Sequence, residues 1–228
     1  RHLAEFWMVE PEIAFMDVKQ LMSLIEAFIR TVIKDVYENC QDSINLFAAN
    51  NPEIKTRLLS VINKEFVRVS YEEGIEILKK AVNDGYPFED KNIFFGKDLA
   101  SEHERYICEK VYNGPVFLYN YPKEIKSFYM KQNPDGRTVA GADLLVPGVG
   151  EICGGSEREA DFDKLMQRVK ELNMDASSIQ WYLDLRKYGY HSSSGFGLGF
   201  ERLIMYILDL DNIRDAILFP RYEGNIKF

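Results

Sequence analysis

The sequence predicts an α+β fold: one domain in which an antiparallel β-sheet is flanked by helices. Turn signals connect strand-like segments in the middle of the chain, and helical patterns lie before and after them. A doubly wound parallel sheet would instead alternate strands and helices along the chain. No linker-like segment divides the 228 residues, and this length is sufficient for a single large core.

Each expected element follows from a local pattern. Apolar residues recur every three or four positions over 18–36, which predicts a long amphipathic helix. Ser70 with Glu73, and Ser101 with Glu104, have the spacing of helix capping boxes. In order, the expected elements are extended segments within 1–15, a helix from 18 that is broken at 50–52, a strand over 66–69, helices over 70–82 and from 101 to about 113, a strand over 115–121, a hairpin of 128–130 and 140–146 around the turn 133–136, a strand over 150–158, helices over 162–172 and 175–187, and a strand and helix over 195–208.

Composition restricts the class of protein and its compartment. The net charge of −8 argues against a nucleic-acid surface over the whole domain, although it leaves room for a local basic groove. Cys40, Cys108 and Cys153 are few and far apart, so we expect no disulfide framework or zinc site, and a reducing cytoplasm is the expected location. The apolar stretches are short and interrupted by charges, so no signal peptide or membrane span is expected.

Three glycines alternate within residues 195–199 and are followed by Glu201, Arg202 and an apolar helical run. Alternating glycines leave one face of a strand bare, so a flat ligand can lie against the backbone. Arg202 falls in the first turn of the next helix, where the helix N-terminus and a guanidinium both favour phosphate. The pattern predicts a nucleotide pocket. A dinucleotide loop is disfavoured because Phe200 replaces its third glycine, but a core strand before a buried helix remains an alternative.

The N-terminal segment offers a cation, an aromatic ring and an acid in one row. If this segment is extended, residues two apart share a face. His2, Phe6 and Glu10 then lie on one face, and Leu3 and Trp7 lie on the other. Such a row suits a nucleotide, which needs charge for phosphate and a ring for stacking on the base. An edge strand with one core face and one mixed face explains the pattern equally well.

Polar residues on two neighbouring strands suggest further ligand contacts. Asp143 and Glu151 flank a Pro-Gly loop, and two carboxylates on adjacent strands can bridge a magnesium ion that also holds phosphate oxygens. Two surface acids are the alternative. Arg158 follows the glycine pair Gly154–Gly155 and could grip a carboxylate or amide oxygen. A bulged strand with a surface arginine would also explain this second pattern.

Taken together, these motifs resemble the catalytic domain of class II aminoacyl-tRNA synthetases of the aspartate/asparagine subgroup, and the asparagine-specific members of bacterial type most of all. The resemblance covers essentially the whole chain, 1–228. Its anchors are Arg1–Trp7, Ser101–Tyr106, Tyr121–Met130, residues 150–156 and Gly195–Arg202. It implies the antiparallel sheet with flanking helices of that family.

The resemblance also implies site residues. It implies catalytic roles for Arg1 and Arg202; ATP binding by Arg1, His2, Leu3, Phe6, Glu151, Gly199, Glu201 and Arg202; magnesium binding by Asp143 and Glu151; and recognition of the amino-acid side chain by Glu10 and Arg158. Phe6 corresponds to the ring that stacks on adenine. Arg1 and His2 correspond to residues that meet the ATP phosphates.

The implied activity is ATP-dependent activation of L-asparagine and its transfer to the 3′ end of tRNA(Asn), by a homodimer without membrane association. A carboxamide presents one acceptor oxygen and one donor nitrogen, which Arg158 and Glu10 would satisfy. Aspartate would place a carboxylate against Glu10, and polar sites reject such mismatches by factors on the order of 10⁴. An aspartyl-tRNA synthetase, a synthetase-derived amide ligase without tRNA activity, and a non-catalytic binding module remain as alternatives.

The chain departs from the family pattern in several places. The first signature motif, the arginine that opens the second motif and the anticodon-binding OB domain are not in this chain, so we expect an N-terminally truncated catalytic domain. Glu157 stands where bacterial-type members commonly have glutamine, which adds negative charge beside Arg158. Tyr190–Ser194 replaces a Pro-His-containing segment before the glycines, which puts the fine geometry of that part of the pocket in question.

Overall fold

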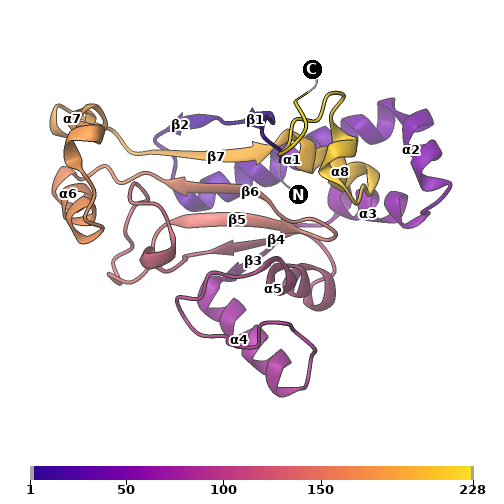
Figure 1. The fold of residues 1–228 in the computed structure, drawn as a ribbon, viewed down its shortest axis with the longest axis horizontal. Coiled ribbons are helices and arrows are strands. Elements are labelled where there is room, and N and C mark those ends of the chain that lie inside the picture. The colour runs from indigo at the N-terminus through magenta and orange to yellow at the C-terminus, as the bar shows by residue number, and fades with distance from the viewer. Residues whose placement is uncertain (1–2, 227–228) are drawn as a thin grey trace.

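The computed structural model describes residues 3–226, and a seven-stranded sheet forms its centre. The strand order is β1-β7-β6-β5-β4-β3, and β2 also pairs with β7 (Figure 1). The strands are β1 (Met8–Val9), β2 (Glu12–Ala14), β3 (Val67–Ser70), β4 (Val116–Tyr119), β5 (Gly141–Val146), β6 (Gly150–Glu157) and β7 (Ser193–Gly199). Pairing is antiparallel apart from β3 with β4, so the predicted antiparallel sheet is confirmed, with one parallel pair at its edge.

Helices lie along one face, at one edge and at one end of this sheet (Figure 1). They are α1 (Val18–Asn39), α2 (Gln41–Ala48), α3 (Glu53–Asn63), α4 (Tyr71–Asn83), α5 (Ser101–Arg105), α6 (Phe162–Glu171), α7 (Gln180–Lys187) and α8 (Phe200–Leu208). Short π- or 3₁₀-helical segments are η1 (Tyr106–Val111), η2 (Lys123–Ile125), η3 (Ala176–Ile179) and η4 (Ile213–Ala216). The α+β class predicted from the sequence is therefore confirmed.

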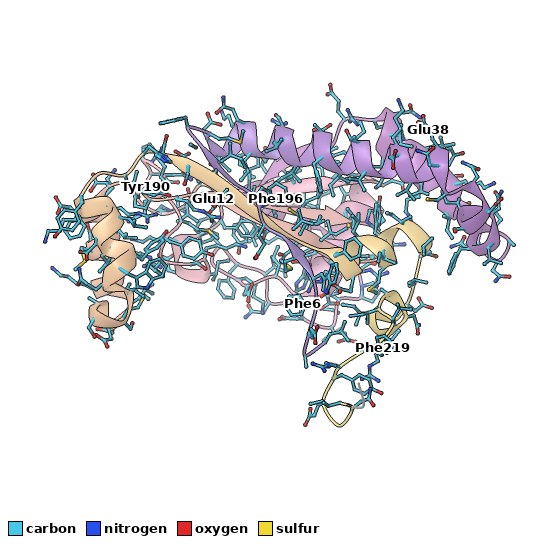
Figure 2. The ribbon with its side chains drawn as sticks, turned by 90° about the horizontal axis from the view of Figure 1, so that it is seen from above. Phe6, Glu12, Glu38, Tyr190, Phe196 and Phe219 are labelled. Atoms are coloured by element: carbon cyan, nitrogen blue, oxygen red, sulfur yellow. The ribbon has the colours of Figure 1, made fainter. Side chains whose placement is uncertain are left out.

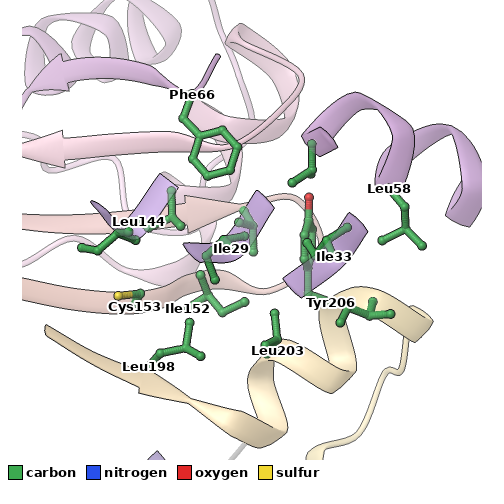
Figure 3. Packing of buried hydrophobic residues seen from close by; sticks show 14 of the residues in the cluster. Ile29, Ile33, Leu58, Phe66, Leu144, Ile152, Cys153, Leu198, Leu203 and Tyr206 are labelled. Atoms are coloured by element: carbon green, nitrogen blue, oxygen red, sulfur yellow. The ribbon is translucent and has the colours of Figure 1, made fainter. Parts of the chain in front are cut away.

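Helix α1 supplies the middle of the main core. Its Ile25, Ile29 and Ile33 recur every four residues and are at most 1% exposed. They belong to one buried cluster with Leu144 of β5 and Leu198 of β7 (Figure 3). Full burial of such a side chain contributes roughly 1.5–3 kcal/mol to folding, so the apolar stripe read from the sequence fixes α1 on this face of the sheet.

The opposite face of the sheet is covered differently along its width. Over β3 and β4, a second buried cluster includes Ile75 of α4, Ile107 of η1 and Leu118 of β4. Over β5 to β7, the same face carries Asp143 and Gly197, which line a cavity. Side chains alternate along a strand, so the residues that flank Asp143 point into the α1 core while Asp143 itself points away from it.

Two capping boxes were predicted, and one of them forms. Ser70 caps α4 by accepting from the Glu73 amide, and the Glu73 carboxylate accepts from the Ser70 amide, as the capping box requires. The box expected at Ser101 and Glu104 does not form. The N-cap of α5 is Ala100, and the Glu104 carboxylate instead accepts from the Glu151 amide at 3.3 Å. The Glu104 carboxylate therefore accepts a long-range hydrogen bond in place of the expected local capping bond.

Three expected elements also differ from those in the structure. The helix expected to run to residue 50 ends at Asn39, and the chain continues as α2 and then as α3, which no pattern had predicted. Residues 128–130 form no strand; Met130 makes a single bridge to Arg158 beside the predicted turn. The helix expected over 175–187 is divided into η3 and α7. Among residues 3–226, no helix combines the length and apolarity needed to cross a membrane.

The end of α8 is held by an arginine from α3. Arg57 donates to the Tyr206 carbonyl oxygen and pairs with Asp209, both at 2.6 Å. Asp209 has a left-handed backbone conformation, with φ at 58°. Burial opposes ionisation of Asp209, but hydrogen bonds from Arg57 and Asn51 and the Arg57 charge lower its pKa below 3.8. A cation at a helix C-terminus is favourable, so this ion pair stabilises α8 where the carbonyl groups lack partners.

We expect Asp209→Asn to reduce the free energy of unfolding at pH 7 by about 1 kcal/mol. Asparagine tolerates the left-handed conformation, so the substitution removes mainly the charge. A carboxyl whose pKa is lowered by folding stabilises above its unfolded pKa, and that stability is lost as the pH falls through the folded pKa. The difference from the wild type, measured by urea unfolding, should therefore shrink toward zero as the pH falls below the ordinary aspartate pKa of about 3.9. Asp211→Asn, at an exposed position, is the control, and a deficit that persists undiminished at low pH would contradict the assignment.

Candidate active site

The glycines of β7 form the floor of the candidate site. A Cβ atom at position 197 would lie 2.9 Å from the Met8 methyl carbon, and one at position 195 would lie 2.7 Å from Nη2 of Arg158. The Glu12 carboxylate also occupies the space beside Gly195. Side chains are therefore absent where the N-terminal segment and Arg158 approach the strand. The bare strand face predicted from the alternating glycines lines a cavity rather than the core.

Three cavities border Glu151, and the glycines of β7 line two of them. The first, of about 420 Å³, is lined by Glu10, Asp143, Glu151 and Arg158, with further residues around them. The second, of about 250 Å³, is lined by Leu3, Phe6, Gly199, Glu201 and Arg202, again with Glu151. The third, of about 180 Å³, lies between Ser101, Glu104 and Arg202. Glu151 borders all three cavities, and together they are called the cleft.

Two carboxylates converge in this cleft. A Cβ atom at Gly154 would lie 3.1 Å from Oδ1 of Asp143 and 3.0 Å from Oε1 of Glu151, so both carboxylates reach the same spot. Asp143 is 5% exposed and is paired with Lys126, whose Nζ lies 2.5 Å from Oδ2. Burial and the Asp143 charge raise the pKa of Glu151. Burial and the Glu151 charge likewise raise the pKa of Glu104 to about 7.

These acids fit a divalent cation. Carboxylate oxygens are the ligands that Mg²⁺ prefers, and burial together with mutual repulsion raises the pKa values of Glu104 and Glu151. Residues 3–226 contain no cluster of three or more His, Cys, Asp or Glu side chains arranged around a metal. Asp143 and Glu151 would therefore hold Mg²⁺ together with phosphate oxygens and water, which is how Mg²⁺ is usually bound.

Arg202 stands at the wall shared by two of the cavities. It lies in the first turn of α8, and its Nη1 donates to the Glu151 carbonyl oxygen at 2.8 Å. That bond orients the guanidinium and leaves most of its N–H groups for a ligand. Glu201 is 3% exposed and accepts from the Trp7 amide at 3.0 and 3.1 Å. Glu201 thus connects the N-terminal segment to α8 by hydrogen bonds.

The N-terminal segment reaches the cleft, but its side chains do not alternate as predicted. Phe6 is 54% exposed and lines the same cavity as Leu3, although the two were expected on opposite faces. The backbone bends before β1 begins at Met8, which breaks the alternation. The predictions for Arg1 and His2 lie outside the described residues.

Arg158 and Glu10 line one cavity, but the structure pairs Arg158 with Glu12. The Arg158 guanidinium donates through Nη2 at 2.9 Å and through Nε at 3.1 Å to the Glu12 carboxylate, and through Nη1 to Ser156 at 2.7 Å. Glu157 does not add charge to this group as expected, because it points to the other side of β6 and pairs with Lys131 at 2.6 Å.

Another cavity, of about 500 Å³, lies outside this cleft. It is lined by Glu5, Trp7, Phe200, Leu218 and Phe219, with a few further residues. Most of its lining is apolar; it shares Glu201 with the second cavity of the cleft but borders neither Glu151 nor Arg202. We therefore place the candidate site in the cleft at Glu151.

Comparison with known proteins decides the family. Residues 1–223 match the family model of the class II tRNA synthetases (D, K and N). The chain belongs to this family.

Individual relatives within the class II synthetases agree with this result. The chain is 54% identical over 229 residues to the asparagine--tRNA ligase of Ureaplasma urealyticum serovar 10; the match covers 100% of this chain and 50% of that protein. It is 41% identical to an asparaginyl-tRNA synthetase of Pyrococcus horikoshii solved with asparaginyl-adenylate, with a TM-score of 0.87 over 99% of this chain and 49% of the other. An aspartyl-tRNA synthetase of Entamoeba histolytica, at 24% identity over 99% of this chain and 45% of its own, shares the fold with a TM-score of 0.80. The chain thus spans about half the length of the relatives it matches.

Proposed function

We propose that the protein activates L-asparagine with ATP and transfers it to the 3′ end of tRNA(Asn). The observation that carries this proposal is the joint lining of one cavity by Glu10, Arg158, Asp143 and Glu151, beside a second cavity that holds Phe6 and Arg202. The first cavity offers a donor and an acceptor for a carboxamide, and the second offers a ring and a cation for a nucleotide. Two relatives that carry an asparagine-specific name at 54% and 41% identity support the choice of amino acid.

The chemistry needs no protein nucleophile. The asparagine carboxylate oxygen would attack the α-phosphorus of ATP, the bond from that phosphorus to the β-phosphate would break, and pyrophosphate would leave with the bonding electrons. The terminal ribose hydroxyl of tRNA would then attack the adenylate carbonyl and release AMP. The protein contributes by positioning these groups and by stabilising charge that develops on phosphate oxygens.

Each described site residue has a place in this scheme. Arg202 would bind phosphate oxygens, and Phe6 would stack on adenine. Arg158 would donate to the amide oxygen of asparagine, and Glu10 would accept from the amide nitrogen. Asp143 and Glu151 would hold Mg²⁺, which neutralises phosphate charge when it is bound. For Arg1 and His2, phosphate binding rests on the sequence alone.

Leu3, Gly199 and Glu201 contribute shape rather than charge to the nucleotide cavity. Leu3 and Gly199 border it, and Glu201 is engaged with the Trp7 amide. We propose that Glu201 acts on ATP indirectly, by holding the segment that carries Phe6. A homodimer and a cytoplasmic location stay predictions from the sequence, as does the assignment of residues 1–228 to a catalytic domain that works with an OB domain.

Exchange of radioactive pyrophosphate into ATP tests the proposal directly in the complete protein. Asparagine should support exchange, aspartate should do so at least 10²-fold less well, and tRNA(Asn) should be charged. Chelation of divalent cations with EDTA should abolish exchange, and added Mg²⁺ should restore it. Preference for aspartate would indicate an aspartyl-tRNA synthetase, and exchange without tRNA charging would indicate an amide ligase. No exchange with either amino acid would refute the proposal.

A further inference from the structure

A series of hydrogen bonds connects Arg158 to Tyr190 through Glu12, which also lines the cavity, and through Ser193. The Tyr190 hydroxyl lies 2.6 Å from Oγ of Ser193, and Ser193 donates to Oε1 of Glu12 at 2.7 Å. Glu12 in turn accepts from Arg158. Because Ser193 has a single proton and gives it to an acceptor-only carboxylate, Tyr190 must donate to Ser193. Tyr190 thus donates to Ser193 and Ser193 to Glu12, while Arg158 donates to Glu12 from the other side, so the hydrogen bonds converge on the Glu12 carboxylate.

The geometry at Arg158 shows what these hydrogen bonds do. The guanidinium has five N–H groups, and three of them are engaged by Glu12 and Ser156. Glu12 takes the Nε and Nη2 edge, which leaves the remaining N–H groups on the Nη1 and Nη2 side for the cavity that Glu10 also borders. A bidentate carboxylate fixes the plane of the guanidinium as well as its position. Rotation of Glu12 would therefore turn the donors away from a ligand.

Glu12 alone does not hold this orientation, because its side chain is 47% exposed. Burial acts to raise the pKa of Glu12, but hydrogen bonds from Arg158 and Ser193 lower it below its ordinary value. Ser193, in contrast, is 2% exposed and lies on β7, so it is a fixed anchor for one carboxylate oxygen. Figure 2 shows Glu12 and Tyr190 toward the end of β7 next to α7, with Phe6 toward the other end.

Tyr190 is itself held by two neighbouring side chains. Arg186 lies 3.8 Å from the ring centre, and the His191 ring is stacked at 5.3 Å with an interplanar angle of 16°. Arg186 is 6% exposed and donates to the Glu159 carbonyl oxygen at 3.1 Å. The tyrosine hydroxyl is thus presented to Ser193 by a ring that packs against Arg186 and His191.

We propose that Tyr190 and Ser193 are positioning residues that act through Glu12 to orient Arg158 toward the amino-acid side chain. Both lie in Tyr190–Ser194, the segment where this chain departs from the Pro-His-containing pattern of its family. The inference rests on the proposed function, because it assigns Arg158 to the amino acid. In this protein, a tyrosine hydroxyl and a serine hydroxyl thus act in series to orient the arginine.

The test compares Ser193→Ala, Tyr190→Phe and the double variant in pyrophosphate exchange by the complete protein. We expect Ser193→Ala to raise KM for asparagine about tenfold and Tyr190→Phe about threefold, with KM for ATP unchanged, because a hydrogen bond to a charged group is lost only on the amino-acid side. Because the two hydroxyls act in series, KM for asparagine in the double variant should stay within about twofold of the value for Ser193→Ala. Ser193→Thr keeps the hydroxyl and should restore KM to within about threefold of the wild type.

Ser192→Ala is the matched control, because Ser192 is the exposed neighbour of Ser193 and should leave both KM values unchanged. An unchanged KM for asparagine in Tyr190→Phe and Ser193→Ala would overturn the inference, and so would multiplicative effects in the double variant or an equal rise of KM for ATP. The proposed function is judged separately, by the wild type alone. If the wild type activates aspartate instead, the same variants are compared with aspartate, since Arg158 would orient its carboxylate by the same contacts.

Discussion

Arg202→Ala is expected to lower the rate of asparagine-dependent pyrophosphate exchange by about 10³-fold, with the fold intact. Arg202 brings a permanent positive charge to the wall between two cavities, near the converging carboxylates of Asp143 and Glu151. Its Nη1 bond to the Glu151 carbonyl oxygen holds the guanidinium in place before any ligand arrives. Charge stabilisation by a preorganised group costs no reorganisation during the reaction, so its removal should reduce kcat more than substrate binding.

Two further variants make this expectation specific to the position and geometry of the charge. Arg202→Lys keeps the charge but loses the planar, bidentate donor, so exchange should be restored only in part. Arg214→Ala removes an exposed arginine from η4, where its guanidinium lies 3.5 Å from the centre of the Tyr222 ring, and should leave exchange close to normal. Near-normal exchange in Arg202→Ala, with an unchanged melting temperature, would remove Arg202 from the proposed mechanism.

The fold could be predicted from the sequence wherever one local pattern determined an element. The stripe of apolar residues in α1 and the reciprocal bonds of Ser70 and Glu73 are of this kind. Ser101 and Glu104 have the same spacing, yet Glu104 accepts from the Glu151 amide, 47 residues away. Spacing cannot show that a distant donor competes for a side chain. The break at Cys40 between α1 and α2 was missed for a related reason, because apolar residues continue on both sides of it.

The site could be predicted as a set of residues but not as a set of contacts. Glu10 and Glu12 are two positions apart in an extended segment, so sequence reasoning could not tell which of them meets Arg158. The register of β2 on β7 decides it, because Glu12 lies opposite Gly195. Lys126 was also missed as a site residue, since it follows the short η2 turn in an irregular segment whose direction no periodicity reveals. Its neighbours in the motif Tyr121–Met130 were the only signal.

Glu10→Gln is expected to reduce the preference for asparagine over aspartate by about 10²-fold. Glu10 borders the amino-acid cavity close to Gly197, where a Cβ atom would lie 3.8 Å from its Oε1. The carboxylate would accept from the amide nitrogen of asparagine and repel the carboxylate of aspartate. Glutamine has nearly the same shape, and its amide nitrogen can donate to the aspartate carboxylate without like-charge repulsion. The change should appear mainly as faster exchange with aspartate, measured as kcat/KM for each amino acid.

Glu5→Gln is the matched control for this expectation. Glu5 lies in the same N-terminal segment, but it pairs with Arg221 at 3.0 Å beside the cavity outside the cleft. Loss of that surface charge should leave the ratio of the two kcat/KM values within about twofold of the wild type. If Glu10→Gln lowers exchange with asparagine but gives no gain with aspartate, Glu10 contributes to binding without discriminating against charge. Selectivity would then have to reside in the other charged groups of that cavity, first among them Arg158 and its partner Glu12.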